Sequence, residues 1–184
     1  MKDLEPLPLS DKISGAPHPS EATTIFGQDS AQQQFLNAFD RGRLHHAWLL
    51  SGPRGVGKAT LVWKIAKFLL TTPNAPAQDG LFGAMSQHVS NLETPPNHPA
   101  LPRILAGSEP ALCVLRRSYD EKRKRFKQNI TVDDVRSLKS FFGLSAADGG
   151  ARVVIIDAAD DMTGSAANAL LKMLEEPPNN AFLF

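Results

Sequence analysis

The chain has 184 residues, a length typical of one domain with some additional sequence. Its 20 lysine and arginine residues nearly balance its 19 aspartate and glutamate residues, and the formal net charge of +1 excludes a wholly basic nucleic-acid-binding protein while allowing a local basic patch. A single cysteine, Cys113, excludes an intrachain disulfide and a cysteine-built zinc site, and no apolar run is long enough to span a membrane, so we expect a cytoplasmic protein without membrane contacts.

The first 21 residues are rich in proline and show no periodicity. Four prolines interrupt any helical or strand pattern in this segment, namely Pro6, Pro8, Pro17 and Pro19. We expect an N-terminal arm over 1–21 that is docked on the domain or on a partner, or is disordered. Residues 22–184 are expected to form one domain, truncated at its end, which contains a variable proline-rich and basic stretch at 73–130.

Helical and strand patterns alternate after the arm. In chain order we expect a helix at 28–40, a strand at 46–51, a helix at 58–70, a strand at 111–115, a helix at 131–142, a strand at 152–157, a helix from Ser165 to Pro177, and a strand at 181–184. Thr131 and Asp134 have the spacing of a capping box, and Ser165 is expected to cap the next helix. This alternation predicts an α/β domain with a parallel sheet covered by helices on both faces.

A glycine-rich turn joins the strand at 46–51 to the helix at 58–70. Its sequence, GPRGVGKAT, matches the phosphate-binding pattern G-x-x-x-x-G-K in the strand-to-helix context that this pattern requires. Backbone N–H groups of such a loop bind phosphate oxygens, and Lys58 would reach the β- and γ-phosphates. The predicted nucleotide-binding residues are Gly52, Pro53, Arg54, Gly55, Val56, Gly57, Lys58, Ala59 and Thr60. The expected ligand is ATP or ADP with Mg²⁺, bound weakly.

Alanine occupies two positions that support hydrolysis in proteins with this loop. Ala59 stands where a hydroxyl normally binds Mg²⁺, and Thr60 is rotated about 100° around the helix from that position. The strand RVVIID ends at Asp157, which would hold Mg²⁺ through water, but Ala158 follows where a glutamate would activate the attacking water. We therefore predict no catalytic residue. The alternative is an active ATPase in which Thr60 and Asp160 replace the lost groups.

Further along the chain, SAANALLKMLEEPPNNAFLF (Ser165–Phe184) closely resembles the stretch after the Walker B strand in bacterial clamp-loader subunits of the AAA+ class. The segments HAWLLSGPRGVGKATL and FGQ (Phe26–Gln28) are similar to the same family. The resemblance runs from about residue 24 to 184 and is weakest over 73–130. It implies a P-loop NTPase fold of AAA+ type. It also implies a subunit of the hetero-pentamer of DNA polymerase III that loads the sliding clamp onto primer–template DNA.

Within this family, Ala59 and Ala158 favour a member with degraded nucleotide motifs over the hydrolysing motor subunit. Many of these subunits carry a zinc module built from four cysteines, whereas this chain has only Cys113, so no zinc is expected. The motor subunit remains the alternative identification.

The sequence RRSYDEKRKRFK, at 116–127, contains seven basic and two acidic residues. One interpretation is a surface that follows a nucleic-acid phosphate backbone or an acidic partner. The other, which we favour from the sequence alone, is a solvated loop or edge hairpin whose lysines oppose aggregation. Steep salt dependence of DNA binding would distinguish the first interpretation from the second.

Overall fold

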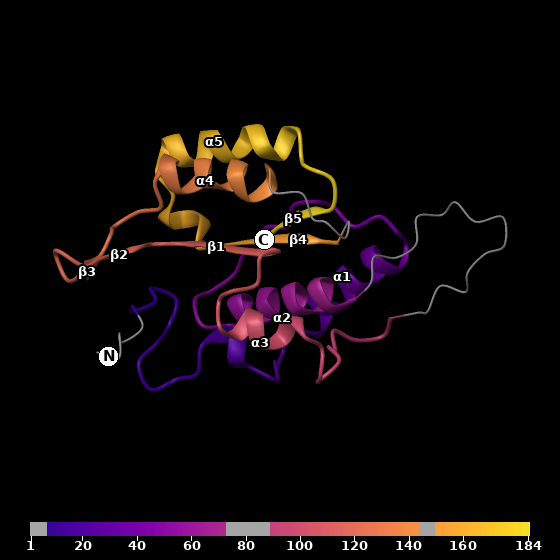
Figure 1. The fold of residues 1–184 in the computed structure, drawn as a ribbon. Helices are drawn as coiled ribbons and strands as arrows, with labels where there is room; N and C mark the ends of the chain where they lie inside the picture. The colour runs from indigo at the N-terminus through magenta and orange to yellow at the C-terminus, as the bar shows by residue number, and fades with distance from the viewer. Residues whose placement is uncertain (1–6, 73–88, 144–149) are drawn as a thin grey trace.

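The computed structural model describes residues 7–72, 89–143 and 150–184 (Figure 1). Residues 1–6 of the expected arm and residues 73–88 of the expected variable stretch lie outside this description. Within the described residues, no helix is long and apolar enough to cross a membrane.

The centre of the fold is a parallel sheet. Its strands are β1 (Leu112–Arg116), β4 (Arg152–Asp157) and β5 (Ala181–Leu183), in the spatial order β1-β4-β5. The register pairs Arg116 with Asp157 at the carboxyl ends of β1 and β4. The strands predicted at 111–115, 152–157 and 181–184 are therefore confirmed, with β1 shifted by one residue.

Helices cover both faces of this sheet, as the sequence pattern predicts (Figure 1). On one side lie α1 (Asp29–Asp40), α2 (Lys58–Thr71) and α3 (Ala100–Leu105). On the other side lie α4 (Val132–Gly143) and α5 (Gly164–Glu175). This layered arrangement confirms the predicted α/β class.

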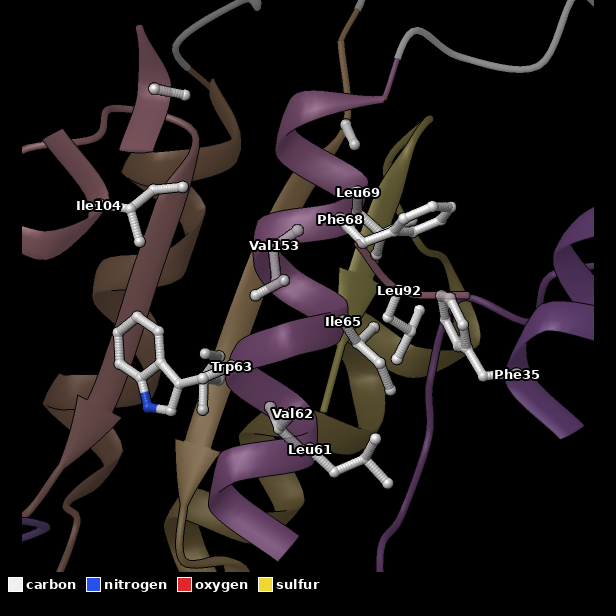
Figure 2. Packing of buried hydrophobic residues seen from close by; sticks show 14 of the residues in the cluster. Phe35, Leu61, Val62, Trp63, Ile65, Phe68, Leu69, Leu92, Ile104 and Val153 are labelled. Carbon is white, nitrogen blue, oxygen red and sulfur yellow. The ribbon is translucent and has the colours of Figure 1, made fainter. Parts of the chain in front are cut away.

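Strand β4 divides the hydrophobic core into two clusters. Because side chains alternate along a strand, Val153 and Ile155 pack against α1, α2 and α3, whereas Val154 packs against α4 and α5. Figure 2 shows the first cluster, with the buried side chains of α2 facing Val153 and Phe35. The nearly continuous apolar sequence of β4 reflects this burial on both faces.

The prediction of a buried strand at 46–51 is only partly right. Ala47 forms an isolated parallel bridge with Leu183, so this segment runs beside β5 without forming a full strand. The N–H of Trp48 donates to the carbonyl of Leu183 at 2.9 Å, and the N–H of Leu183 donates to the carbonyl of His46 at 2.8 Å. Among the described residues no strand covers the outer side of the segment, and Leu49 is 83% exposed rather than buried.

A short helix, α3, lies within the proline-rich stretch where no element is predicted. Pro99 precedes the helix and Pro102 lies in its first turn, where a missing N–H breaks no intrahelical hydrogen bond. Ala100 and Ile104 are buried against the first cluster. The prolines therefore hide the helical pattern in the sequence, although they are compatible with the first turn of a helix.

The helix caps are partly as predicted. The backbone N–H and hydroxyl of Thr131 both donate to the carboxylate of Asp134 at 2.7 Å, ahead of α4. The prediction that Ser165 caps α5 is wrong. The N-cap is Thr163, which has an extended conformation and whose hydroxyl accepts from the N–H of Ala166 at 3.2 Å.

The basic stretch contains a two-stranded antiparallel hairpin. Its strands are β2 (Tyr119–Asp120) and β3 (Arg125–Phe126), and they form a sheet separate from the central one. The hairpin extends beyond the end of β1 (Figure 1).

Candidate nucleotide-binding site

The loop at 52–57 leads from the segment beside β5 into α2. Gly55 and Gly57 have φ angles of +86° and +93°, which only glycine adopts without strain. Gly57 is the N-cap of α2, so the first N–H groups of this helix lie at the end of the loop. Residues 51–56 are exposed, and a phosphate group therefore has access to the loop.

Lys58 lies folded over the loop that precedes it. Its ammonium group donates to the carbonyl oxygens of Gly52, at 2.8 Å, and Pro53, at 2.9 Å. Both residues are exposed, so these contacts can exchange for phosphate oxygens, which bind an ammonium group more strongly because they are charged. The next side chain, Ala59, carries no oxygen atom, and Thr60 is the first residue of α2 with a hydroxyl group.

Two residues upstream of α1 lie against the loop, Gln28 and Ile25, and the similarity of FGQ (Phe26–Gln28) indicated only the first of them. The side-chain amide of Gln28 donates to the carbonyl of Val56 at 2.7 Å. A Cβ on Gly57 would lie 3.8 Å from the side chain of Ile25. Phe26, between them, is 87% exposed. The segment 25–28 therefore forms part of the candidate site.

Asp157 lies at the same edge of the sheet as the loop, because β4, β5 and the segment before the loop are all parallel. Burial raises the pKa of Asp157, and the charges of Asp11 and Asp161 raise it further, against the opposing effects of Arg116 and His18. This environment disfavours the ionised carboxylate that would hold a magnesium ion.

The residues after Asp157 offer little to replace a catalytic glutamate. Ala158 has no polar side chain, and the short helix η2 (Ala159–Asp161) follows it. Asp161 forms an ion pair with Arg117 at 3.0 Å, whereas Asp160 is exposed. The described residues contain no group of three or more His, Cys, Asp or Glu side chains that could hold a metal ion.

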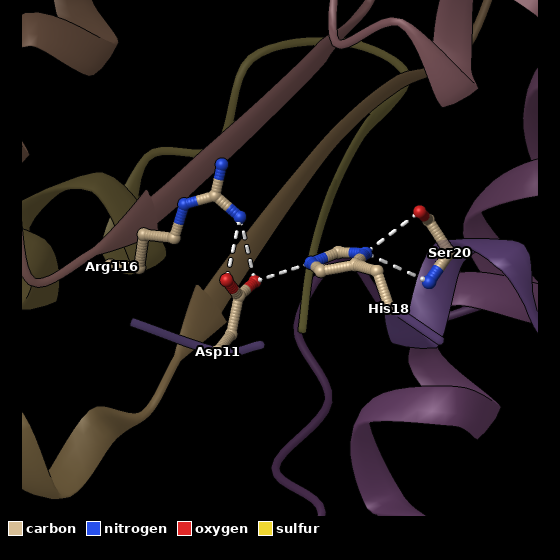
Figure 3. Close-up of polar contacts among 4 residues, drawn as sticks. All are labelled: Asp11, His18, Ser20 and Arg116. Atoms are coloured by element: carbon tan, nitrogen blue, oxygen red, sulfur yellow. Dashed lines mark hydrogen bonds and ion pairs between the residues drawn. The ribbon is translucent and has the colours of Figure 1, made fainter. Parts of the chain in front are cut away.

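The described part of the N-terminal arm docks beside Asp157, an arrangement that the sequence analysis left open between docking and disorder. Arg116 Nη1 donates to both carboxylate oxygens of Asp11, at 2.8 and 2.7 Å, and the side chain of Asp11 is only 1% exposed (Figure 3). His18 Nε2 lies 3.1 Å from the same carboxylate. Arg116 is the register partner of Asp157, so this contact fixes the arm at the carboxyl edge of the sheet.

His18 connects this contact to the rest of the arm. Its Nδ1 accepts from the backbone N–H of Ser20 at 3.1 Å, which leaves the proton on Nε2, facing Asp11. Its ring packs edge-on against Trp63 of α2 at 5.4 Å between centroids. The short helix η1 (Pro19–Glu21) follows and packs on α2. No local sequence pattern signals this arrangement, because Asp11 and Arg116 are 105 residues apart.

The parallel sheet, the helices on both faces and the glycine-rich loop at the start of α2 define a P-loop protein of the AAA+ clamp-loader type. The family described as "DNA polymerase III, delta subunit" matches residues 27–184, and the chain belongs to this family. The match covers the loop, the sheet and both layers of helices.

Relatives with similar sequences are subunits of DNA polymerase III. The chain is 36% identical to the delta' subunit of Pseudomonas aeruginosa, over 78% of this chain and 37% of that protein. It is 31% identical to the delta' subunit of Yersinia pestis, over 82% of this chain and 38% of that protein. It is also 30% identical to the gamma/tau subunit of Mycobacterium tuberculosis, over 90% of this chain and 25% of that protein.

The chain thus spans well under half the length of these relatives. One solved structure, a gamma-subunit-related protein from Thermotoga maritima, is 31% identical over 46% of this chain and 27% of that protein, with a TM-score of 0.33.

Proposed function

We propose that this chain is the nucleotide-site region of a delta-prime-type clamp-loader subunit that binds nucleotide without hydrolysing it efficiently. One observation carries this proposal: Lys58 spans an open phosphate loop, while the positions beside it and after Asp157 are Ala59 and Ala158. The groups for phosphate contact are present. The hydroxyl that would bind Mg²⁺ and the carboxylate that would activate water are not. Loss of a positioned base alone slows such reactions by about 10²–10⁴-fold.

The proposed ligand is ATP or ADP, with its phosphates on the N–H groups at the start of α2 and on Lys58. Of the residues at 52–60, Gly52, Gly55 and Gly57 would let the phosphates approach the backbone most closely, because none of the three carries a side chain. Magnesium would be held mainly by the phosphates, and Asp157 would contact it only through water. Binding is expected to be weak because the protein supplies so few ligands to the metal.

The proposed partners are the other subunits of a hetero-pentameric clamp loader, and through them the sliding clamp and primer–template DNA. The delta-prime names of the relatives support this role. We also propose that residues 22–184 form the AAA+ domain and that residues 1–21 act as an arm of that domain. The buried contact between Asp11 and Arg116 supports this division into a domain and an arm, because it holds the arm against the sheet.

Calorimetric titration of the full-length protein with MgATP and MgADP tests the nucleotide site. Lys58→Ala removes the charged phosphate contact, so affinity should fall about 10–100-fold, the equivalent of about 1.5–3 kcal/mol for a charge-assisted hydrogen bond. Lys172→Ala, an exposed lysine on α5, is the matched control and should leave affinity unchanged. Absence of nucleotide binding by the unmodified protein would refute the nucleotide part of the proposal.

Assembly is tested separately, by mixing the full-length protein with purified gamma/tau and delta subunits and following complex formation by size-exclusion chromatography. Co-elution in a stable complex is the expected result. Failure to enter such a complex would refute the clamp-loader role, whatever the titrations show.

A second candidate function is that of an active motor ATPase. It is favoured by the 30% identity to gamma/tau over 90% of the chain and by the exposed carboxylate of Asp160 in η2. Steady-state ATP turnover decides between the two functions. Turnover that is abolished by Lys58→Ala and by Asp160→Asn would establish the motor function and overturn the non-hydrolysing one.

A further inference from the structure

The β2–β3 hairpin concentrates positive charge at one corner of the molecule. Residues 116–127 contain seven basic and two acidic residues, a net charge of +5, whereas the whole chain carries +1. The remainder of the chain therefore carries a net charge of −4. Such an asymmetric distribution produces a strong local positive potential on a protein whose overall charge is near zero.

Much of the positive charge of the hairpin is not neutralised within the described chain. At the base of the hairpin, Arg116 contacts Asp11 and Arg117 contacts Asp161. Beyond these residues, four basic side chains are exposed and make no ion pair or side-chain hydrogen bond with any residue that the structure describes: Lys122, Lys124, Arg125 and Lys127.

Protection of a sheet edge does not account for these cations. The edge strand of the central sheet on this side is β1, and its only basic residue, Arg116, is engaged by Asp11. The exposed cations lie on a separate hairpin whose strands are two residues long. Strands of that length offer hardly any backbone for another chain to pair with, so they need little protection.

The hairpin is also rigidly built for its size. The rings of Tyr119 and Phe126 pack edge-to-face at 5.3 Å across the two strands. The carboxylate of Asp120 accepts from the backbone N–H groups of Lys122, at 3.0 Å, and Arg123, at 3.1 Å, and so ties down the turn. This carboxylate lies 3.8 Å from the guanidinium of Arg123. The cations are thus held on an ordered frame.

Alternate residues of β3 and its continuation project from the same face. Arg125 and Lys127 lie on the face opposite Phe126, about 6.6 Å apart along the strand. Together with Arg123 they line a small surface cavity of about 270 Å³, to which Asp120, Phe126 and Gln128 also contribute. A nucleic-acid strand carries a phosphate about every 3.4 Å along the helix axis, so two cations about 6.6 Å apart can contact phosphates of one strand, which supplies negative charge at regular intervals.

We propose that this hairpin binds the phosphate backbone of a nucleic acid. The inference rests on the proposed function, in which the assembly acts on primer–template DNA, and adds a contact site within this chain. Because the rings of Tyr119 and Phe126 pack on each other, they are not free to stack on bases. Recognition is therefore through phosphates alone and independent of base sequence.

Fluorescence anisotropy of a labelled primer–template duplex tests this inference, with the full-length protein titrated over a series of KCl concentrations. The variant Arg125→Gln/Lys127→Gln removes two cations from one face. The variant Lys122→Gln/Lys124→Gln removes two cations from the turn. It shows whether a loss of DNA binding in the first variant could come from a local folding defect. The matched control, Arg41→Gln/Arg43→Gln, removes the same charge from exposed positions after α1.

Each phosphate contact contributes about 0.9 to the slope of log K against log [salt], or about eightfold in affinity between 1 M and 0.1 M salt. Each hairpin variant should therefore bind up to about 60-fold more weakly at 0.1 M salt, with a slope shallower by up to about 1.8. The control variant should lose far less affinity for DNA. Changing the base sequence of the duplex should alter neither the affinities nor the slopes.

Equal DNA binding and equal slopes for the unmodified protein and both hairpin variants would overturn the inference. The same holds if DNA binding is unchanged while co-elution with gamma/tau and delta becomes weaker, because the hairpin would then bind an acidic protein surface. Failure of the unmodified protein to co-elute would refute the proposed function alone, since the DNA titrations are made on the isolated full-length chain.

Discussion

Replacement of Arg116 by alanine should release the N-terminal arm from the sheet. The carboxylate of Asp11 is 1% exposed and receives both of its shortest contacts from Arg116, which is itself 25% exposed. Removing the arginine leaves a buried carboxylate whose remaining side-chain hydrogen bond among the described residues is to the ring of His18. Asp11 can regain contact with water only if the arm undocks. The measured loss of stability therefore cannot exceed the free energy that holds the arm on the sheet.

The expected loss of stability differs between the two partners, because removing Arg116 leaves a buried charge whereas removing Asp11 does not. Breaking a buried pair by removing one partner costs about 3–5 kcal/mol, so arm opening should become at least about 100-fold more frequent in Arg116→Ala. Asp11→Ala instead leaves an arginine that can turn into water, and it loses hydrogen bonds to a charged group worth about 1.5–3 kcal/mol. The double variant should resemble Asp11→Ala, because the stranded carboxylate is then gone.

Hydrogen exchange of the full-length protein, followed by mass spectrometry on peptides from residues 7–22, measures this opening segment by segment. Trp63 fluorescence provides an independent signal, since the ring of His18 packs against it. Exchange of the arm that is unchanged in Arg116→Ala, or faster in Asp11→Ala than in Arg116→Ala, would refute the reasoning.

Two further predictions concern the edge of the sheet and the loop. Asp157→Asn should stabilise the protein at pH 7, because the raised pKa of Asp157 means that folding disfavours its charge. This advantage should shrink as the pH falls through the raised pKa and vanish near the ordinary aspartate value of about 3.9, as seen in denaturation midpoints at several pH values. Gly57→Ala should cost about 1–2 kcal/mol at its φ of +93°, whereas Gly164→Ala, at the start of α5, should be neutral or slightly stabilising. Thermal unfolding of the two variants compares them directly.

Local features could be predicted from the sequence because their causes lie within a few residues. The glycines at 55 and 57 take the positive φ angles expected of a phosphate loop, and the helix that follows begins at Lys58. The uninterrupted apolar run of β4 indicated burial on both faces, which the two core clusters confirm. Thr131 and Asp134 similarly interact across the first turn of α4.

Features that depend on partners distant in the chain could not be predicted in this way. The proline pattern of 89–110 concealed α3, whose stability comes from burying Ala100 and Ile104 against α2 and η1. The segment 46–51 has the composition of a buried strand, but among the described residues it forms only the bridge from Ala47 to Leu183, and Leu49 is exposed. The support that Gln28 gives to the loop depends on a carbonyl 28 residues away.

Motif spacing and side-chain identity are properties of the chain, so the candidate phosphate loop, the alternation that builds a parallel α/β sheet, and the alanines at 59 and 158 could all be recognised in the sequence. The docking of the N-terminal arm through Asp11 and Arg116, which places a further carboxylate near Asp157, became evident only in the folded structure. The folded structure also leaves Lys122, Lys124, Arg125 and Lys127 of the hairpin without an acidic partner among the described residues. Burial and charge pairing depend on which segments are in contact in the folded structure, and local sequence periodicity does not show which distant segments those are.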